Sequence, residues 1–150
     1  MQPASVRPAT YADLETLVPL FDGYRQFYGQ PSERHRVREF LNERLTQGDS
    51  VLFIAEADGR AVGFTQLYPS FSSVSMARIF ILNDLFVLTE ARRSGVARRL
   101  LEAAVRHGRE AGAIRLSLST ALTNTAAQAL YDSAGWERDA VFCVYQRALA

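Results

Sequence analysis

A glycine-containing turn between an apolar strand and an amphipathic helix has the residue types that bind phosphate. The strand ends in Leu85-Phe86-Val87, and the turn reads Arg92-Arg93-Ser94-Gly95-Val96-Ala97. The first amides of a helix have no acceptors within it, and its aligned dipoles give that end partial positive charge. Gly95 lets a phosphate approach the backbone closely. The 92–97 turn is therefore predicted to hold a phosphorylated ligand.

The overall composition argues against several classes of partner. The chain has 150 residues, 48% of them hydrophobic, and a formal net charge of +1. So small a charge gives no reason to expect nucleic acid or a membrane surface as a partner. No apolar run reaches the roughly 20 residues of a membrane span, and the first residues lack the pattern of a signal peptide. We expect one cytoplasmic domain over residues 1–150.

Two residue counts exclude further kinds of chemistry. Cys143 is the only cysteine, so the chain has no internal disulfide and too few thiolates for a metal site. We therefore expect no metal. All 17 basic residues are arginine, so no lysine is present to complete a P-loop.

Hydrophobic periodicity predicts strands and helices on both sides of this turn. The predicted strands are Val6–Pro8, Val51–Ala55, Ala61–Tyr68, Met76–Val87, Ile114–Ser119 and Val141–Tyr145. The predicted helices are one capped by Thr10 with Asp13, one capped by Ser32 and ended by Gly48, Gly95–Ala111, and one from Asn124 to Gly135. Asp58-Gly59 predicts a hairpin, and the segment Met76–Ser119 predicts a right-handed parallel crossover. The fold class is therefore α/β with a mixed sheet.

Two motifs in this order make the chain similar to the GNAT superfamily of acyl-CoA-dependent N-acetyltransferases. The first motif is the 92–97 turn. The second is Asn124-Thr125-Ala126-Ala127-Gln128-Ala129-Leu130-Tyr131-Asp132-Ser133-Ala134-Gly135-Trp136. The element order agrees with that family over nearly the whole chain. The resemblance implies a central, mostly antiparallel sheet of about six to seven strands, splayed at the cofactor site and flanked by four helices.

The resemblance also implies that acetyl-CoA is the cosubstrate and indicates which residues hold it. The turn would bind the pyrophosphate, the preceding strand would lie along the pantetheine arm, and Tyr131 would protonate the departing thiolate. The predicted cofactor residues are Leu85, Phe86, Val87, Arg92, Arg93, Ser94, Gly95, Val96, Ala97, Asn124, Ala127 and Tyr131. Two alternatives stay open at this stage: Asn124 as a plain helix cap and Tyr131 as a core residue.

Direct attack of an amine on a thioester needs a base for the proton of the ammonium group. Asp84 is the predicted base, since it lies just before Leu85, where a strand amide would bind the thioester carbonyl oxygen. Many small-amine members carry a glutamate where this chain has Asn83. Asp84 or a water chain must therefore accept the proton, unless Asp84 is only structural.

An aromatic segment in the first half of the chain is implied to line the acceptor pocket. Aromatic faces beside carboxylates suit a cationic amine. The predicted substrate-binding residues are Tyr24, Phe27, Tyr28, Tyr68, Asn83 and Asp84, and Phe71 is a further candidate. The alternative is that Tyr24 and Tyr28 pack on the sheet. The segment is similar to the small-amine and histone-type branch of the superfamily.

The predicted function is transfer of an acetyl group from acetyl-CoA to a primary amine of a small molecule, such as a polyamine, an amino acid or a related amine. One alternative is acetylation of protein or peptide N-termini. Another is a CoA-binding sensor without catalysis, which Asn83 would favour. The resemblance also allows a homodimer formed through the last strand, by Val141, Phe142, Val144 and Tyr145.

Overall fold

The computed structural model describes residues 3–150, which form two compact units, one up to Ser119 and one from Thr120 to Ala150. The elements of the first unit are β1 (Ser5–Pro8), α1 (Leu14–Phe27), α2 (Arg34–Gln47), β2 (Val51–Ala57), β3 (Arg60–Ser72), β4 (Ala77–Val87), α3 (Val96–Glu110) and β5 (Leu116–Ser117). Short 3-10 turns, η1 (Tyr11–Asp13) and η2 (Thr89–Ala91), precede α1 and α3. The strand order is β1-β2-β3-β4-β5, and only the β4–β5 pair is parallel.

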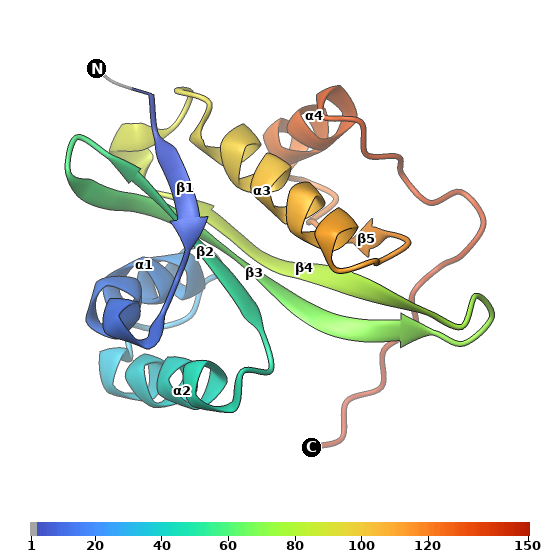
Figure 1. The fold of residues 1–150 in the computed structure, drawn as a ribbon, viewed down its shortest axis with the longest axis horizontal. Coiled ribbons are helices and arrows are strands. Elements are labelled where there is room, and N and C mark those ends of the chain that lie inside the picture. The colour runs from blue at the N-terminus through green and yellow to red at the C-terminus, as the bar shows by residue number, and fades with distance from the viewer. Residues whose placement is uncertain (1–2) are drawn as a thin grey trace. The chain divides into compact units, whose positions relative to one another are not determined.

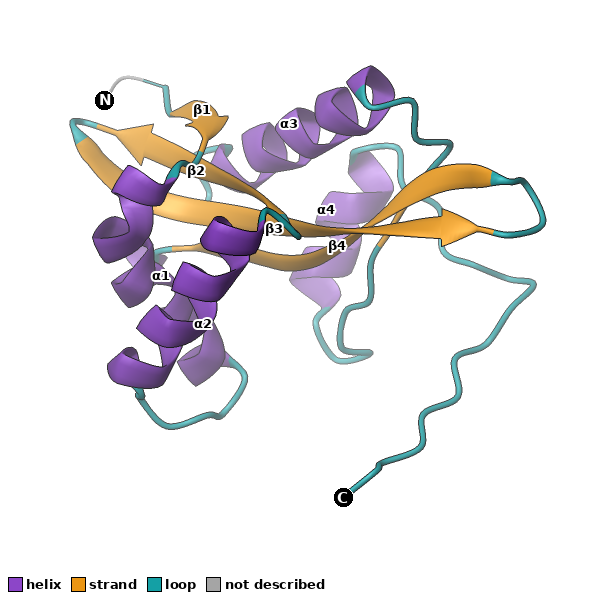
Figure 2. Cartoon of the chain, turned by 60° about the horizontal axis from the view of Figure 1, so that its bottom comes forward, coloured by secondary structure: helices purple, strands orange, loops and turns teal. Residues whose placement is uncertain are grey.

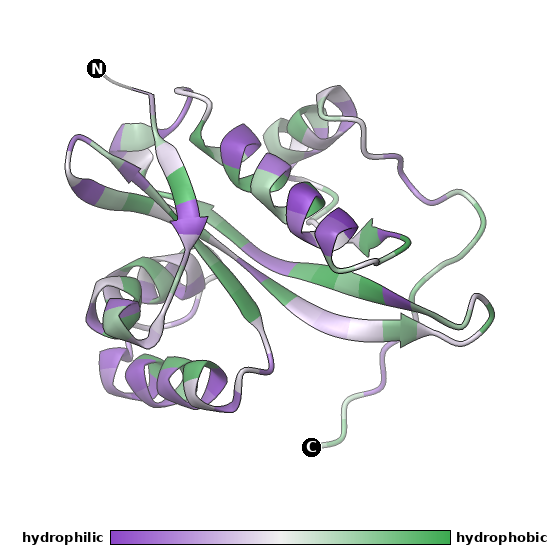
Figure 3. Ribbon diagram, viewed as in Figure 1, coloured by the Kyte–Doolittle hydropathy of each residue, from purple (hydrophilic) through white to green (hydrophobic). Residues whose placement is uncertain are grey.

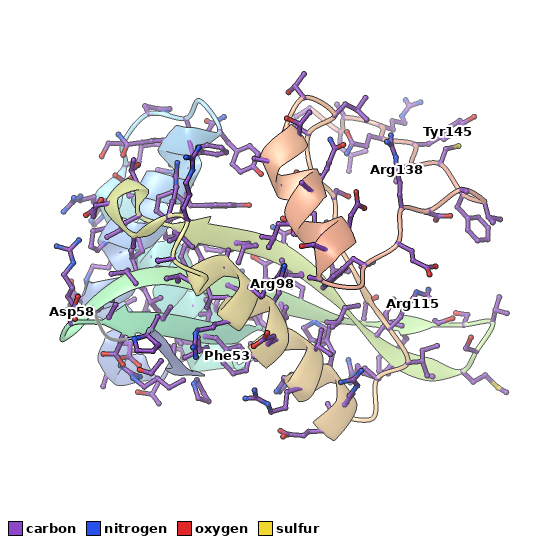
Figure 4. The ribbon with its side chains drawn as sticks, turned by 90° about the horizontal axis from the view of Figure 1, so that it is seen from above. Phe53, Asp58, Arg98, Arg115, Arg138 and Tyr145 are labelled. Atoms are coloured by element: carbon purple, nitrogen blue, oxygen red, sulfur yellow. The ribbon has the colours of Figure 1, made fainter. Side chains whose placement is uncertain are left out.

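Helices cover both faces of this sheet, α1 and α2 on one side and α3 on the other (Figures 1 and 2). The helix α1 buries Leu17 and Phe21 against Phe64 of β3. The helix α2 is mostly hydrophilic (Figure 3) and buries only Val37 and Leu41. On the opposite face, the ring of Phe53 in β2 lies 5.8 Å from that of His107 in α3. Figure 4 shows Phe53 on the side of the sheet that α3 covers.

The start of α1 is fixed by a buried carboxylate. Asp13 Oδ2 accepts the amide of Thr10 at 2.7 Å, as the predicted cap requires, and Arg7 donates to both oxygens of Asp13 at 2.8 and 2.9 Å. The hydrogen bonds from Arg7 hold the pKa of Asp13 down at about 2. Arg7 Nε also donates to Glu56 Oε1 at 2.7 Å. The side chain of Arg7 therefore links β1 both to β2 and to the start of α1.

The predicted cap of α2 is wrong by one residue. Glu33 is the N-cap. The hydroxyl of Ser32 donates instead to Asp22 Oδ2 of α1 at 2.6 Å, and the amide of Glu33 donates to Asp22 Oδ1 at 2.8 Å. Asp22 thus holds the Ser32 side chain away from the helix start and joins α1 to the beginning of α2. Gly48 ends α2 in a left-handed conformation, as predicted.

A β-bulge in β4 changes which face of the sheet its side chains occupy. Asp84 pairs with Gln66 and Leu82 pairs with Leu67, so Asn83 is the extra residue. Phe80 lies before the bulge and packs on His107 of α3, whereas Phe86, after it, packs on Tyr24 of α1. Side chains six residues apart on a regular strand would share a face. The bulge therefore turns Asp84 and Phe86 toward α1 and α2.

The parallel pairing between β4 and β5 is very short. The predicted strand Ile114–Ser119 contributes only Leu116 and Ser117, which pair with Phe80 and Ile81. Within residues 3–150, β4 from Leu82 to Val87 has no strand partner on its β5 side. The pairing between β4 and β5 therefore ends next to the bulge. This agrees with the prediction that strands separate at the cofactor site.

The second unit contains α4 (Thr125–Ser133), which Asn124 caps by accepting the amide of Ala127 at 3.1 Å. The predicted strand Val141–Tyr145 is absent from this part of the described chain, so the sheet has five strands rather than six to seven. Strands need hydrogen bonds to a neighbouring strand. Here the amides of Val141 and Phe142 donate to the side chain of Asp139, at 2.8 and 3.0 Å.

No helix within the described residues is long and apolar enough to cross a membrane.

Candidate active site

A buried carboxylate lies where β4 bulges. Asp84 is 2% exposed, and both of its carboxylate oxygens accept hydrogen bonds. Gln66 Nε2 donates to Oδ2 at 2.6 Å, and Asn83 Nδ2 donates to Oδ1 at 2.8 Å. Gln66 is itself oriented, because its Oε1 accepts the hydroxyl of Ser50 at 2.8 Å. Neighbouring strand residues therefore fix the plane of this carboxylate.

The surroundings of Asp84 favour its acting as a base. Burial raises the pKa of its carboxyl, and hydrogen bonds from Asn83, Gln66 and Tyr24 oppose that rise. A carboxylate with a raised pKa holds a proton more readily than one in water. Burial and the nearby charge of Asp84 raise the pKa of Tyr68 to about 12, and they also raise that of Tyr24. Both phenols therefore stay protonated, so each hydroxyl is able to donate and to accept a hydrogen bond.

Asp84 lies in the wall of a cavity of about 310 Å³ between α1, α2 and the sheet. This Asp84 cavity is lined by Phe21, Tyr24, Arg25, Arg36, Val37, Phe40, Tyr68, Asn83 and Asp84. Four of the predicted substrate-binding residues therefore come together: Tyr24, Tyr68, Asn83 and Asp84. The Tyr24 ring also packs on Phe64 at 5.8 Å, and its hydroxyl donates to Asn83 O at 3.0 Å. Tyr24 thus both packs on the sheet and lines the cavity.

The structure places Phe27 and Tyr28 outside the residues that line this cavity. They lie at the end of α1, where they are 55% and 51% exposed. The helical period explains this result, because residues three and four positions beyond Tyr24 lie a full turn further along α1. Phe71 is 67% exposed on β3, and the guanidinium of Arg78 stacks over its ring at 4.1 Å.

Sequence reasoning missed five residues of the cavity wall: Phe21, Arg25, Val37, Phe40 and Arg36. Phe21, Val37 and Phe40 belong to the apolar faces of α1 and α2, so periodicity assigns them to the core. A usable signal did exist, because Phe21 lies three residues before Tyr24 and four before Arg25, which is helical spacing.

The 92–97 turn has the backbone shape of an anion site. Arg93 and Gly95 both adopt positive φ, of 64° and 82°. The first helical bond runs from the amide of Arg99 to Gly95 O at 3.1 Å. Within residues 3–150, no backbone acceptor is recorded for the amides of residues 93–97. Successive amides left without partners by a left-handed turn form a concave surface that binds anions.

Arg92 connects this turn to β4. Its Nε donates to Val87 O at 2.9 Å, and its guanidinium lies over Phe27 at 5.6 Å and over Phe86 at 5.8 Å. Phe27 therefore contacts the predicted phosphate site. Leu85 and Phe86 are half-buried and Val87 is buried, all on the stretch of β4 that has no partner toward β5.

The remaining predicted residues belong to the second unit. Asn124 is the helix cap of α4, Ala127 is the residue whose amide it accepts, and Tyr131 lies one turn further along. The ring of Tyr131 lies 6.2 Å from that of Trp136, and Tyr131 O accepts the Trp136 amide at 3.0 Å. Capping is thus one established role of Asn124.

The fold and the site together define an acyl-CoA-dependent N-acetyltransferase. The sequence model of the Acetyltransferase (GNAT) family matches residues 17–136, and the chain belongs to that family. The uncharacterised N-acetyltransferase YhfO of Bacillus subtilis (strain 168) is 47% identical over 94% of this chain and 95% of its own length.

Solved structures agree with this assignment. The crystal structure of a probable acetyltransferase has a TM-score of 0.93 and 44% identity, covering 97% of this chain and 98% of that one. The aminoglycoside N-acetyltransferase AAC(6')-Iy, in complex with a bisubstrate analogue containing CoA, has a TM-score of 0.79 and 26% identity. That alignment covers 98% of this chain and 99% of the other.

Proposed function

We propose that this protein transfers the acetyl group of acetyl-CoA to a primary amine of a small molecule that enters the Asp84 cavity. The observation that carries this proposal is the position of Asp84 at the β4 bulge. Its carboxylate lines a cavity on the α1 and α2 side of the sheet. Among the described residues, the same strand has no partner on its β5 side from Leu82 to Val87. The site therefore offers a base for the amine and a free strand edge for the extended arm of the cofactor.

The residues present fit coenzyme A. A diphosphate needs donors and positive charge, and the amides of residues 93–97 and the Arg92 side chain supply both. An extended arm needs free backbone groups, which β4 offers from Leu82 to Val87 within the described chain. Once bound, the cofactor supplies an activated acetyl thioester.

Asp84 removes the proton that the acceptor amine must lose. Its two oxygens each accept one amide hydrogen, and a carboxylate oxygen has room for further donors. The hydroxyl oxygens of Tyr24 and Tyr68 accept hydrogen bonds from the ammonium group, and the aromatic walls attract its charge. As the new C–N bond forms and the C–S bond breaks, a β4 amide near Leu85 donates to the carbonyl oxygen. Tyr131 returns a proton to the leaving thiolate, in the role that its motif implies.

Two observations support a small acceptor. The Asp84 cavity, at about 310 Å³, lies at the lower end of the range for small-molecule sites. AAC(6')-Iy, which shares this fold, is an aminoglycoside acetyltransferase.

The experiment is acetylation of a panel of amines, followed by release of free thiol and by the mass of the product. The panel contains amino acids, polyamines, aminoglycosides and short peptides with free N-termini. We expect an acetylated small molecule and a stoichiometric amount of CoA. Acetylation of peptides alone would replace the proposal with N-terminal acetylation. Uptake of CoA with no acetylated product from any amine would leave only a CoA-binding protein.

A further inference from the structure

The residues that line the Asp84 cavity include one negatively charged side chain and two positively charged ones. Asp84 is its only lining carboxylate among the residues that the structure describes. Its other charged lining residues are Arg25 of α1 and Arg36 of α2, and the remainder of the wall is mostly aromatic. One carboxylate can balance one ammonium group. A polyamine or an aminoglycoside would bring further positive charges, and these would meet two arginines.

The two arginines are incompletely neutralised. Both pair with the same carboxylate: Arg25 Nη1 lies 3.1 Å from Glu33 Oε2, and Arg36 Nη1 lies 2.8 Å from Glu33 Oε1. The other nearby carboxylate, Asp22, accepts from Ser32 and the Glu33 amide and lies 3.9 Å from Arg34. Three guanidinium groups therefore face two carboxylates, and positive charge is left over at this side of the cavity.

The arginines are also able to reach a ligand. Arg25 is held in place, since its side chain is only 22% exposed and its Nη1 also contacts Pro31 O at 3.4 Å. Arg36 has a side chain that is 72% exposed, so it can turn its free guanidinium nitrogens toward an incoming anion. A planar guanidinium binds a carboxylate through two parallel hydrogen bonds.

We propose that the acceptor is a small amino-acid-like molecule, whose primary amine lies at Asp84 and whose carboxylate is bound by Arg25 and Arg36. Its remaining part is apolar or aromatic and packs on Phe21 and Phe40. This inference rests on the proposed function, because it names the class of acceptor that the same cavity takes. It separates this protein from acetyltransferases whose acceptors carry several positive charges.

Matched pairs of acceptors test the proposal. Each pair keeps the amine and its skeleton and differs in the carboxylate: phenylalanine against phenethylamine, and leucine against isoamylamine, with an aminoglycoside as the polycation. We expect kcat/KM to be at least about tenfold higher for the carboxylated member, which is the range of a charge-assisted hydrogen bond. Equal or higher kcat/KM for the decarboxylated amines, or for the aminoglycoside, would overturn the inference.

Three variants connect the preference to the arginines. Arg25→Gln and Arg36→Gln should each lower kcat/KM for the carboxylated acceptors about tenfold, mainly through KM, and bring the ratio within each pair toward one. Arg38→Gln is the matched control. Arg38 lies on the same helix but pairs with Glu15 away from the cavity, so its variant should keep the wild-type ratio. Thermal melting of each variant checks that it is folded.

If Arg25→Gln disturbs the contact between α1 and α2, the test of carboxylate binding rests on Arg36→Gln. The side chain of Arg36 is exposed, so its replacement leaves the packing of the two helices unchanged. A ratio that stays at the wild-type value in Arg36→Gln would contradict the assignment. A protein that binds CoA but acetylates no member of the panel would refute the proposed function itself. A preference for decarboxylated amines would refute only the acceptor class.

Discussion

Asp84 combines three properties at one position. It is buried, it is held by two amide donors, and it lines a cavity large enough for a small molecule. The sequence predicted Asp84 as the base from its residue type and from its position directly before Leu85. Its partner Gln66 could not be found in that way, because the contact depends on how β3 pairs with β4. Phe21 and Phe40 were missed because a pocket wall and a core face have the same helical period.

Replacing the base should change both the rate and its pH dependence. Asp84 must be ionised to accept a proton, so kcat/KM should fall as the pH falls through its raised pKa. That acidic limb should therefore lie above the ordinary value of about 4 for an aspartate. Asp84→Asn should lower kcat/KM by about 10²–10⁴-fold and remove the limb.

Asp58→Asn is the control for this pair of pH profiles. Asp58 lies at the tip of the β2–β3 hairpin (Figure 4), and asparagine tolerates its φ of 51°. A wild-type rate or an unchanged acidic limb in Asp84→Asn would show that another group accepts the proton.

Tyr131 is assigned by motif to the leaving group, so its loss should affect turnover more than binding. Tyr131→Phe should lower kcat about tenfold or more, while the Kd for CoA stays within about twofold. Steady-state kinetics and calorimetry measure the two effects. Tyr145→Phe, at a side chain that is 91% exposed, is the control. If Tyr131→Phe turned over at the wild-type rate, the role of general acid would have to be given to another group.

At the scale of elements, hydrophobic pattern and turn residues predicted most of the fold. The hairpin at Asp58-Gly59, the end of α2 at Gly48 and the start of α3 after Gly95 all lie where the sequence places them. The bulge at Asn83 could not be predicted, since the continuous apolar runs before and after it look like parts of one regular strand. The prediction of a strand over Val141–Tyr145 was wrong for a different reason. Its residues favour a strand, but no strand in the described residues pairs with it.

The start of α1 makes a prediction about stability. The pKa of Asp13 is lowered to about 2 in the folded protein, so its ionised form favours folding. This contribution is complete above the unfolded value of about 4 and is lost as the pH falls through about 2. Asp13→Asn should cost about 1–2 kcal/mol at pH 7, a range discounted because Arg7 is 43% exposed.

Urea titrations at pH 7 and at pH 3 measure that cost. The difference in the free energy of unfolding between wild type and Asp13→Asn should be smaller at pH 3. Glu15→Gln is the control, because the Glu15–Arg38 pair is exposed and should contribute little. A difference that is the same at both pH values would show that the charge of Asp13 is not what stabilises the fold.

At the scale of the first unit, β4 connects two sites that lie on different elements. Its bulge turns Asp84 toward the cavity under α1 and α2, and its last carbonyl, Val87 O, holds Arg92 beside the 92–97 turn. In the part of the chain that the structure describes, the strand edge between these two points has no partner toward β5. A cofactor bound at the turn and extended along β4 would therefore carry its thioester toward Asp84.

The measurement that tests this account most directly is calorimetric titration of CoA into wild type and two glycine variants. Gly95 and Gly112 flank α3, both have positive φ, and a Cβ at either would meet open space. If the amides of residues 93–97 bind the diphosphate, Gly95→Asp should weaken CoA binding at least about tenfold. Gly112→Asp, equally strained but at the other end of the helix, should stay within about twofold of wild type. Equal affinity in the two variants, or no uptake of CoA by the wild type, would contradict the account.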